Sequence, residues 1–210
     1  MDELFSWLLH RSVTASCTIL AVLLMRFLLR RAPKKYSYVL WTAVAFRLCC
    51  PLAFPSAISL FNLLRPVREI AAPDSALSLQ RPGPWSAALR AAAYLWFAGL
   101  LIFLARGAFS YIRLSGKLRT AIRLKDQVYQ SEYVQSPFIL GLIHPKIYIP
   151  FHLEPQKLHY VLLHEKYHLK RHDHLIKTGA YLLLAMYWFN PMCWLSFYLL
   201  NKDMEMSCDE

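Results

Sequence analysis

The sequence has 210 residues, of which 57% are hydrophobic and only 18% are charged, and its mean hydropathy is +0.30. These values are shifted from those of a typical soluble domain and indicate a membrane protein. The formal net charge is +11, but the basic residues lie beside hydrophobic stretches rather than on a recognition motif. This placement argues against direct nucleic-acid binding and favours anionic lipid as the counter-charge.

Three hydrophobic stretches are candidate membrane spans, at about residues 4–29, 36–53 and 85–106. Basic residues crowd the chain after the first and third stretches. They are Arg26, Arg30, Arg31, Lys34 and Lys35, and then Arg106, Arg113, Lys117, Arg119, Arg123 and Lys125. Because positive charge is enriched in cytoplasmic loops, the N-terminus is expected outside, with a transmembrane region over 1–106 and a cytoplasmic or membrane-associated domain over 107–210.

Between residues 127 and 150 the pattern changes to short runs of β-branched and aromatic residues separated by Pro and Gly. These runs predict strands at residues 128–129, 133–134 and 146–149. An extended peptide can bind to a protein as an added strand along a sheet edge. Ile147, Tyr148 and Ile149 could supply such an edge, although a purely structural hairpin explains them equally well.

The most specific feature is the run His-Glu-Lys-Tyr-His at residues 164–168. A helix is predicted from Pro155, a residue suited to the first helical position, to about His172. On that helix His164 and His168 lie one turn apart on one face, where a zinc ion could bridge them. Glu165 could then act on a water molecule as a general base. The structural alternative, without a metal site, is an amphipathic helix that carries two surface histidines.

A catalytic zinc site normally takes a third protein ligand, which must come from another part of the chain. His172 is the weaker candidate, because three ligands at i, i+4 and i+8 span two helical turns, about 12 Å of rise, which is too far for them to converge on one ion. Glu205, in the acidic segment 201–210, is the better one, and Asp209 one turn later could orient a ligand histidine. A solvated acidic terminus is the alternative for this segment, and Cys208 is expected to be a small buried thiol.

Residues 175–200 are long enough for a membrane span but contain Asn190-Pro191 as a break. A helix-turn-helix, either buried in the catalytic domain or dipping into the membrane, would return the chain so that Glu205 approaches the two histidines. We favour this arrangement over a simple span.

Four segments together resemble the BlaR/MecR type of bacterial membrane metallopeptidases, which sense β-lactam antibiotics and inactivate a transcriptional repressor. They are His-Glu-Lys-Tyr-His-Leu-Lys-Arg-His-Asp at 164–173, Phe-Asn-Pro-Met-Cys-Trp at 189–194, Asp-Met-Glu-Met-Ser-Cys-Asp-Glu at 203–210 and Ser-Pro-Phe-Ile-Leu-Gly-Leu-Ile-His-Pro-Lys-Ile-Tyr-Ile-Pro at 136–150. The resemblance implies His164, His168 and Glu205 as zinc ligands and Glu165 as the general base.

The resemblance also implies a mainly α fold, in which multi-pass helices in a bacterial plasma membrane accompany a small gluzincin-like zinc metallopeptidase domain with a short β-sheet. Its expected partners are the lipid bilayer, a protein substrate and a second copy in a homodimer. Such receptors continue into an extracytoplasmic sensor domain, so the chain is expected to be a shortened form, truncated at the C-terminal end of the peptidase domain. The alternatives are a membrane protease of the HtpX or CAAX-processing kind and a non-catalytic membrane transducer.

Overall fold

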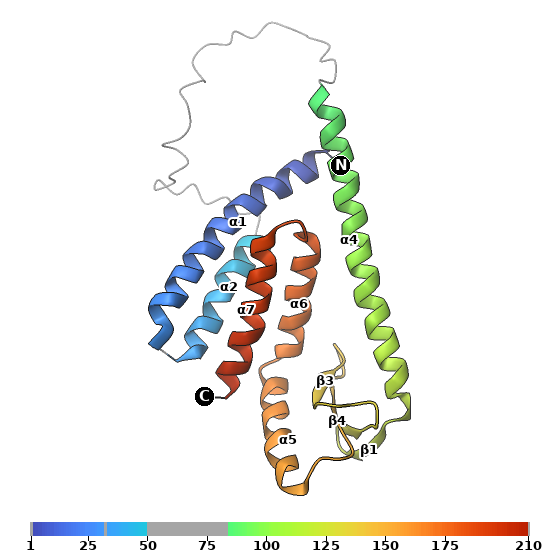
Figure 1. The fold of residues 1–210 in the computed structure, drawn as a ribbon. Helices are drawn as coiled ribbons and strands as arrows, with labels where there is room; N and C mark the ends of the chain where they lie inside the picture. Colours follow the sequence, from blue (N-terminus) through green and yellow to red (C-terminus); the bar gives the residue numbers. More distant parts are fainter. Residues whose placement is uncertain (1, 32, 50–83, 210) are drawn as a thin grey trace, which may run out of the picture.

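The computed structural model describes residues 2–31, 33–49 and 84–209, and in these ranges the fold is mainly α-helical with one small sheet, as the sequence predicts (Figure 1). The helices are α1 (Asp2–Leu28), η1 (Leu29–Arg31), α2 (Lys34–Cys49), α4 (Pro84–Lys117), η2 (Leu118–Thr120), α5 (Pro155–Lys170), α6 (Asp173–Met186) and α7 (Pro191–Cys208). The strands are β1 (Ile122–Lys125), β2 (Val128–Gln130), β3 (Phe138–Leu140) and β4 (Lys146–Ile149).

Among the described residues, two helices are long and apolar enough to cross a membrane, in the segments Trp7–Leu28 of α1 and Ala87–Thr120 at α4. They correspond to the first and third predicted spans. The second predicted span, residues 36–53, is only partly described, because residues 50–53 lie outside the described ranges. Its described part belongs to α2, whose 16 residues rise about 24 Å, short of the roughly 30 Å of a bilayer core.

α4 carries large apolar side chains on its outer surface along most of its length, as a lipid-facing helix would. The exposed ones are Leu89, Tyr94, Leu95, Phe97, Leu101, Ile102, Leu104, Phe109, Tyr111 and Ile112. The helix continues without a break past residue 106 to Lys117. The division at 106/107 therefore stays a prediction, since α4 belongs to both of its parts.

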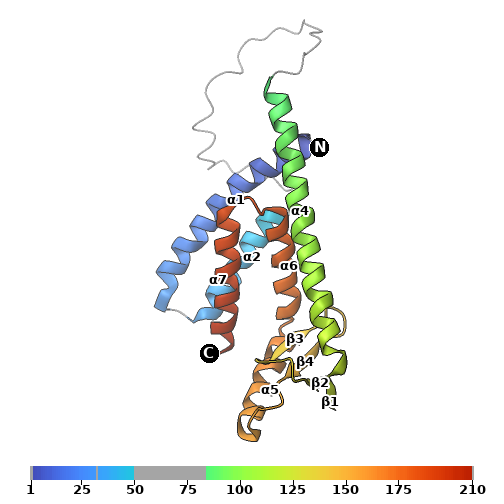
Figure 2. The same ribbon diagram turned by 45° about the vertical axis from the view of Figure 1, so that its right-hand side comes forward.

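α6 and α7 form a helical hairpin between the α1–α2 pair and α4 (Figures 1 and 2). This hairpin confirms the helix-turn-helix predicted for residues 175–200. Its tip is fixed to α1 by Asn190, whose Oδ1 accepts a bond from the Met192 amide at 2.9 Å, while its Nδ2 donates to Ser12 Oγ at 2.8 Å and Ser16 Oγ at 2.9 Å. Asn190 is thus both the N-cap of α7 and its anchor.

Asn190→Ala should destabilise the fold by about 2 kcal/mol, because it removes a helix cap and the hydrogen bond to the buried Ser12 hydroxyl. The free energy of unfolding in detergent measures the effect. Asn201→Ala is the matched control, since Asn201 only donates to the Phe197 carbonyl within the same helix. Equal losses in the two variants would contradict the anchoring role of Asn190.

The sheet has the strand order β1-β2-β4-β3, with β2 parallel to β4 and the other pairs antiparallel. β4 is therefore an internal strand, and Ile147, Tyr148 and Ile149 are buried at 1%, 7% and 0% exposure. The expectation that these three residues form a free edge is wrong, because their backbone groups already pair with β2 and β3. The edge strands of the described sheet are β1 and β3.

One further strand prediction is wrong, and two strands were missed. Residues 133–134 lie in a turn, where the Val134 amide donates to the Ser131 carbonyl, and β1 and β3 were not predicted. β1 has the sequence Ile-Arg-Leu-Lys, which alternates apolar and polar residues as a half-buried strand does, yet all four of its residues are exposed. One face of the sheet packs on α5, through Val128, Ile147 and Ile149 against Leu158, Leu162 and Leu169.

Candidate metal centre

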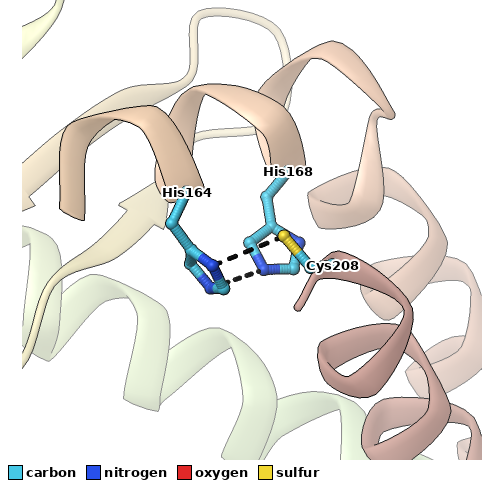
Figure 3. A group of neighbouring side chains, drawn as sticks. All are labelled: His164, His168 and Cys208. Atoms are coloured by element: carbon cyan, nitrogen blue, oxygen red, sulfur yellow. Dashed lines mark hydrogen bonds between the residues drawn. The ribbon is translucent and has the colours of Figure 1, made fainter. Parts of the chain in front are cut away.

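α5 places two imidazole groups against one another at the lower end of the helical bundle. It begins at Pro155, as predicted, and ends at Lys170, so that His164 and His168 lie one turn apart. Their Nε2 atoms are 3.1 Å apart (Figure 3). Glu165, between them in sequence, is buried with 9% of its surface exposed. The helix therefore holds two nitrogen donors and an adjacent carboxyl group at one place.

The returning helix α7 brings Glu205 to this pair. Its Oε2 lies 3.2 Å from His168 Nε2 and 3.8 Å from His164 Nε2. A tetrahedral ion with bonds of about 2.1 Å to its ligands requires donor atoms about 3.4 Å apart. The three separations bracket that value, so the donor set predicted from the sequence fits a zinc ion with one further position for another ligand.

Cys208 is a second candidate donor on α7. Its Sγ lies 3.4 Å from His164 Nδ1 (Figure 3), and His164, His168 and Cys208 also form a group that could hold a metal ion. The sequence predicts a buried packing thiol, whereas the structure places a half-buried thiol beside the histidine. Cys208 approaches Nδ1 of His164, whereas the other ring nitrogen, Nε2, is the one near His168 and Glu205.

The remaining predicted residues lie near the pair at longer distance. Asp209 Oδ1 is 3.7 Å from His164 Nδ1, and its side chain is 72% exposed. That separation is too long for a hydrogen bond, so its orienting role stays a prediction. His172 lies beyond the end of α5 with an exposed side chain and a left-handed backbone, φ 59°, so it does not continue the helix face that carries His164 and His168.

The residue that orients a histidine in this structure is Asp173, which the sequence analysis missed. Its Oδ2 lies 2.6 Å from His168 Nδ1, and it is 1% exposed. This hydrogen bond is the main cause of a raised pKa of His168, which burial opposes. Asp173 is the first residue of α6, and the left-handed turn at His172 folds it back onto α5. Asp173 follows the motif closely in sequence, but its contact with His168 depends on that turn.

Charges around the site act on both of its carboxyl groups. Burial raises the pKa of Glu165, and the neighbouring histidines oppose this rise. For Glu205 burial alone would also raise the pKa, but Lys177, whose Nζ lies 2.9 Å from Oε1, lowers it overall. Glu205 is thus kept ionised, as a metal ligand must be, and the pKa of Glu165 is moved towards neutral pH, as a proton-transferring group requires.

α7 is held in place by a buried carboxylate two residues before Glu205. Asp203 is fully buried, and it accepts bonds from Arg26 Nη2 at 2.7 Å, Arg26 Nε at 2.8 Å and Trp41 Nε1 at 2.9 Å. α7 is also joined to the end of α5, by a hydrogen bond from Arg171 Nη1 to Ser207 Oγ at 3.2 Å. Both sides of the donor set are therefore tied to neighbouring helices.

The family to which the chain belongs follows from comparison with known proteins. The model of the family described as BlaR1 peptidase M56 matches residues 6–210, so the chain belongs to this family. It is 40% identical over 83 residues to the regulatory protein BlaR1 of Bacillus licheniformis. It is 32% identical over 84 residues to the methicillin resistance mecR1 proteins of Staphylococcus aureus and Staphylococcus epidermidis.

These aligned stretches cover 38% of this chain and 14% of each relative. The BlaR/MecR resemblance read from the sequence is confirmed. The family is a peptidase family, and the described part of the chain contains a group, His164, His168 and Cys208, that could hold a metal ion.

The bond between Asp173 and His168 predicts a pH dependence of folding in metal-free protein. Because the pKa of His168 is raised in the folded state, its contribution to stability is fully present below the unfolded-state pKa of about 6.5 and is lost as the pH rises through the folded-state pKa. Asp173→Asn should flatten this decline. Unfolding with a chelator present, from about pH 5 to pH 9, measures it.

His159→Gln is the control for that series, since His159 lies on α5 with an exposed side chain and should leave the decline as it is in the wild type. The interpretation fails if Asp173→Asn keeps the full pH dependence.

Proposed function

We propose that the chain is a zinc-dependent membrane peptidase that hydrolyses a peptide bond in a cytoplasmic protein. One observation carries the proposal. His164, His168 and Glu205 present donor atoms 3.1–3.8 Å apart, beside a buried glutamate. Two imidazoles and a carboxylate with an adjacent general base form the donor set of catalytic zinc in peptidases.

Zinc bound there would supply a Lewis acid that polarises the scissile carbonyl. Glu165 removes a proton from the attacking water and passes it to the leaving amine, a role that its raised pKa supports. Asp173 accepts a hydrogen bond from His168 Nδ1. The proton of the imidazole is then held on Nδ1, and the lone pair on Nε2 is available to the metal. Lys177 keeps Glu205 ionised.

The substrate is proposed to bind as an extended strand beside β3. Among the described strands β3 pairs only with β4, and it contacts α5, which carries the motif. A segment added to the free edge of β3 would run past α5 through main-chain bonds. The edge proposed for pairing with the substrate is therefore β3 and not β4, the strand expected from the sequence.

A cytoplasmic position of the site is supported by the ends of the two candidate membrane helices. α1 ends with Arg26 in its last turn and α4 with Lys117, and both ends lie on the same side of the bundle as α5 and the sheet (Figure 1). Positive charge favours the cytoplasmic face. We therefore place the chain as a multi-pass protein of the bacterial plasma membrane, with a transcriptional repressor in antibiotic-resistance regulation as substrate.

Glu165→Gln should leave about one zinc bound per chain and reduce cleavage at least 100-fold, because only the proton-transferring group is lost. Metal analysis and cleavage of a co-expressed repressor measure the two quantities. Glu154→Gln is the matched control, an exposed residue at the start of the same helix. Unchanged repressor processing in Glu165→Gln would instead favour the non-catalytic transducer, and cleavage of membrane-protein substrates but never of the repressor would favour a protease of the HtpX or CAAX kind.

Zinc affinity decides between the two candidate third ligands. Glu205→Ala should weaken zinc binding more than about 100-fold, beyond the loss typical of residues that only support a ligand. Cys208→Ser should change it far less, because the thiol lies at the other nitrogen of His164. Titration against a zinc-sensitive dye compares them. A larger loss in Cys208→Ser would assign the site to the thiol.

A further inference from the structure

A cavity of about 600 Å³ lies between α2, α6 and α7, on the side of the hairpin that faces α2. Its walls are formed almost entirely by apolar groups, among them Ala45 and Leu48 of α2, Leu183 of α6 and Phe197 of α7. The volume is that of a site for a molecule of drug or lipid-chain size. The metal site does not use it.

The polar side chains that line the cavity already have partners. The Thr42 hydroxyl donates to the Val39 carbonyl at 2.7 Å and the Ser196 hydroxyl to the Cys193 carbonyl at 2.8 Å. Tyr38 donates to Asp173 and Trp41 to Asp203. Because these groups are satisfied within the protein, a polar ligand would gain no hydrogen bond from them. The cavity therefore favours an apolar ligand.

The shape and position of the cavity fit an acyl chain. Its lining on α2 extends from Tyr38 to Cys49, and the eleven helical steps between these residues rise about 16 Å. Ile176 and Leu182, which also line it, are 38% and 51% exposed, so the cavity reaches an apolar outer surface. α2 packs against α1, a candidate membrane helix. The apolar molecules available at such a surface are lipids.

The charge of the chain indicates which lipid. The Tyr38 end of the cavity lies one turn after the start of α2, where Lys34 and Lys35 follow Arg31 in sequence. A cluster of basic residues at the membrane surface attracts anionic headgroups. We propose that the cavity binds an acyl chain of an anionic phospholipid, with the headgroup near the basic start of α2.

In this position the bound acyl chain contacts two side chains that support residues of the candidate metal site. Tyr38, at one end of the cavity, reaches Asp173 at 3.3 Å, and Asp173 holds His168. Trp41 reaches Asp203, two residues from Glu205. A lipid in the cavity packs against both aromatic side chains and so supports the residues that hold two metal ligands.

Photolabelling of the full chain in vesicles tests the proposal. The vesicles contain phosphatidylethanolamine and phosphatidylglycerol, the latter with a diazirine in one acyl chain, and labelled residues are mapped by mass spectrometry. We expect label on the buried lining residues Trp41 and Cys193, and loss of that label in Gly179→Leu. Gly179 lines the cavity, and a Cβ atom added there has no other atom within 4 Å, so a larger side chain at this position can extend into the cavity.

Gly116→Leu is the matched control, since a side chain added to this glycine of α4 also meets nothing within 4 Å, and it should keep the wild-type label at both residues. Ala45→Leu fills the cavity from the opposite wall and should act like Gly179→Leu. Label confined to outward residues such as Ile102, or unchanged in both filled variants, overturns the proposal. Equal label from a phosphatidylcholine probe overturns the anionic headgroup. Labelling needs neither metal nor peptide cleavage, so its outcome is separate from that of the proposed peptidase activity.

Discussion

The candidate metal centre depends on one buried carboxylate, Asp203. Two bonds from Arg26 of α1 and one from Trp41 of α2 fix it, and its burial is complete. Residues two apart on a helix project about 200° from one another, so a helix pinned through Asp203 to α1 and α2 turns Glu205 to its opposite side, where α5 lies. Without these contacts of Asp203, α7 would be freer to rotate about its own axis. The position of Glu205 Oε2 would then be less well defined. A fully buried carboxylate that lost Arg26 would also be an uncompensated charge, which is strongly destabilising.

The histidine side of the centre is held by a similar connection to α2. Tyr38 and Arg171 both approach Asp173 Oδ1, at 3.3 and 3.4 Å, while Oδ2 binds His168. The Arg171 guanidinium also stacks on the Tyr38 ring, 4.6 Å from its centroid. Asp173 therefore has a cation on one oxygen and an imidazole on the other, which satisfies its charge in a buried position. Each of the two ligand-bearing helices is consequently fixed by an aspartate, and each aspartate by the helices at the start of the chain.

The sequence predicted the parts of this centre that follow from local periodicity. The i, i+4 spacing of His164 and His168 and the break at Asn190-Pro191 led to the helix, the hairpin and the return of Glu205, because helical geometry and proline chemistry act within a few residues. The free edge at Ile147–Ile149 was wrong because strand order depends on pairing between segments far apart, and a run of three buried residues fits an internal strand better than an edge. Asp173 was missed for a related reason, since its contact with His168 depends on the left-handed turn at His172 rather than on a repeat.

The contacts of Asp203 and Asp173 have a common consequence for a peptidase of the BlaR/MecR type. A change at the membrane can reach a metal site only through an element that both regions share and that differs between two states. In the described part of the chain, α1 and α2 are the elements that both regions share: α1 is a candidate span, the short turn η1 follows it before α2, and their side chains contact the aspartates on both sides of the donor set. Because Tyr38 and Trp41 both belong to α2, one helix supports the histidine side and the Glu205 side together. The relative position of His168 and Glu205 therefore depends on a helix that packs directly against a candidate membrane helix.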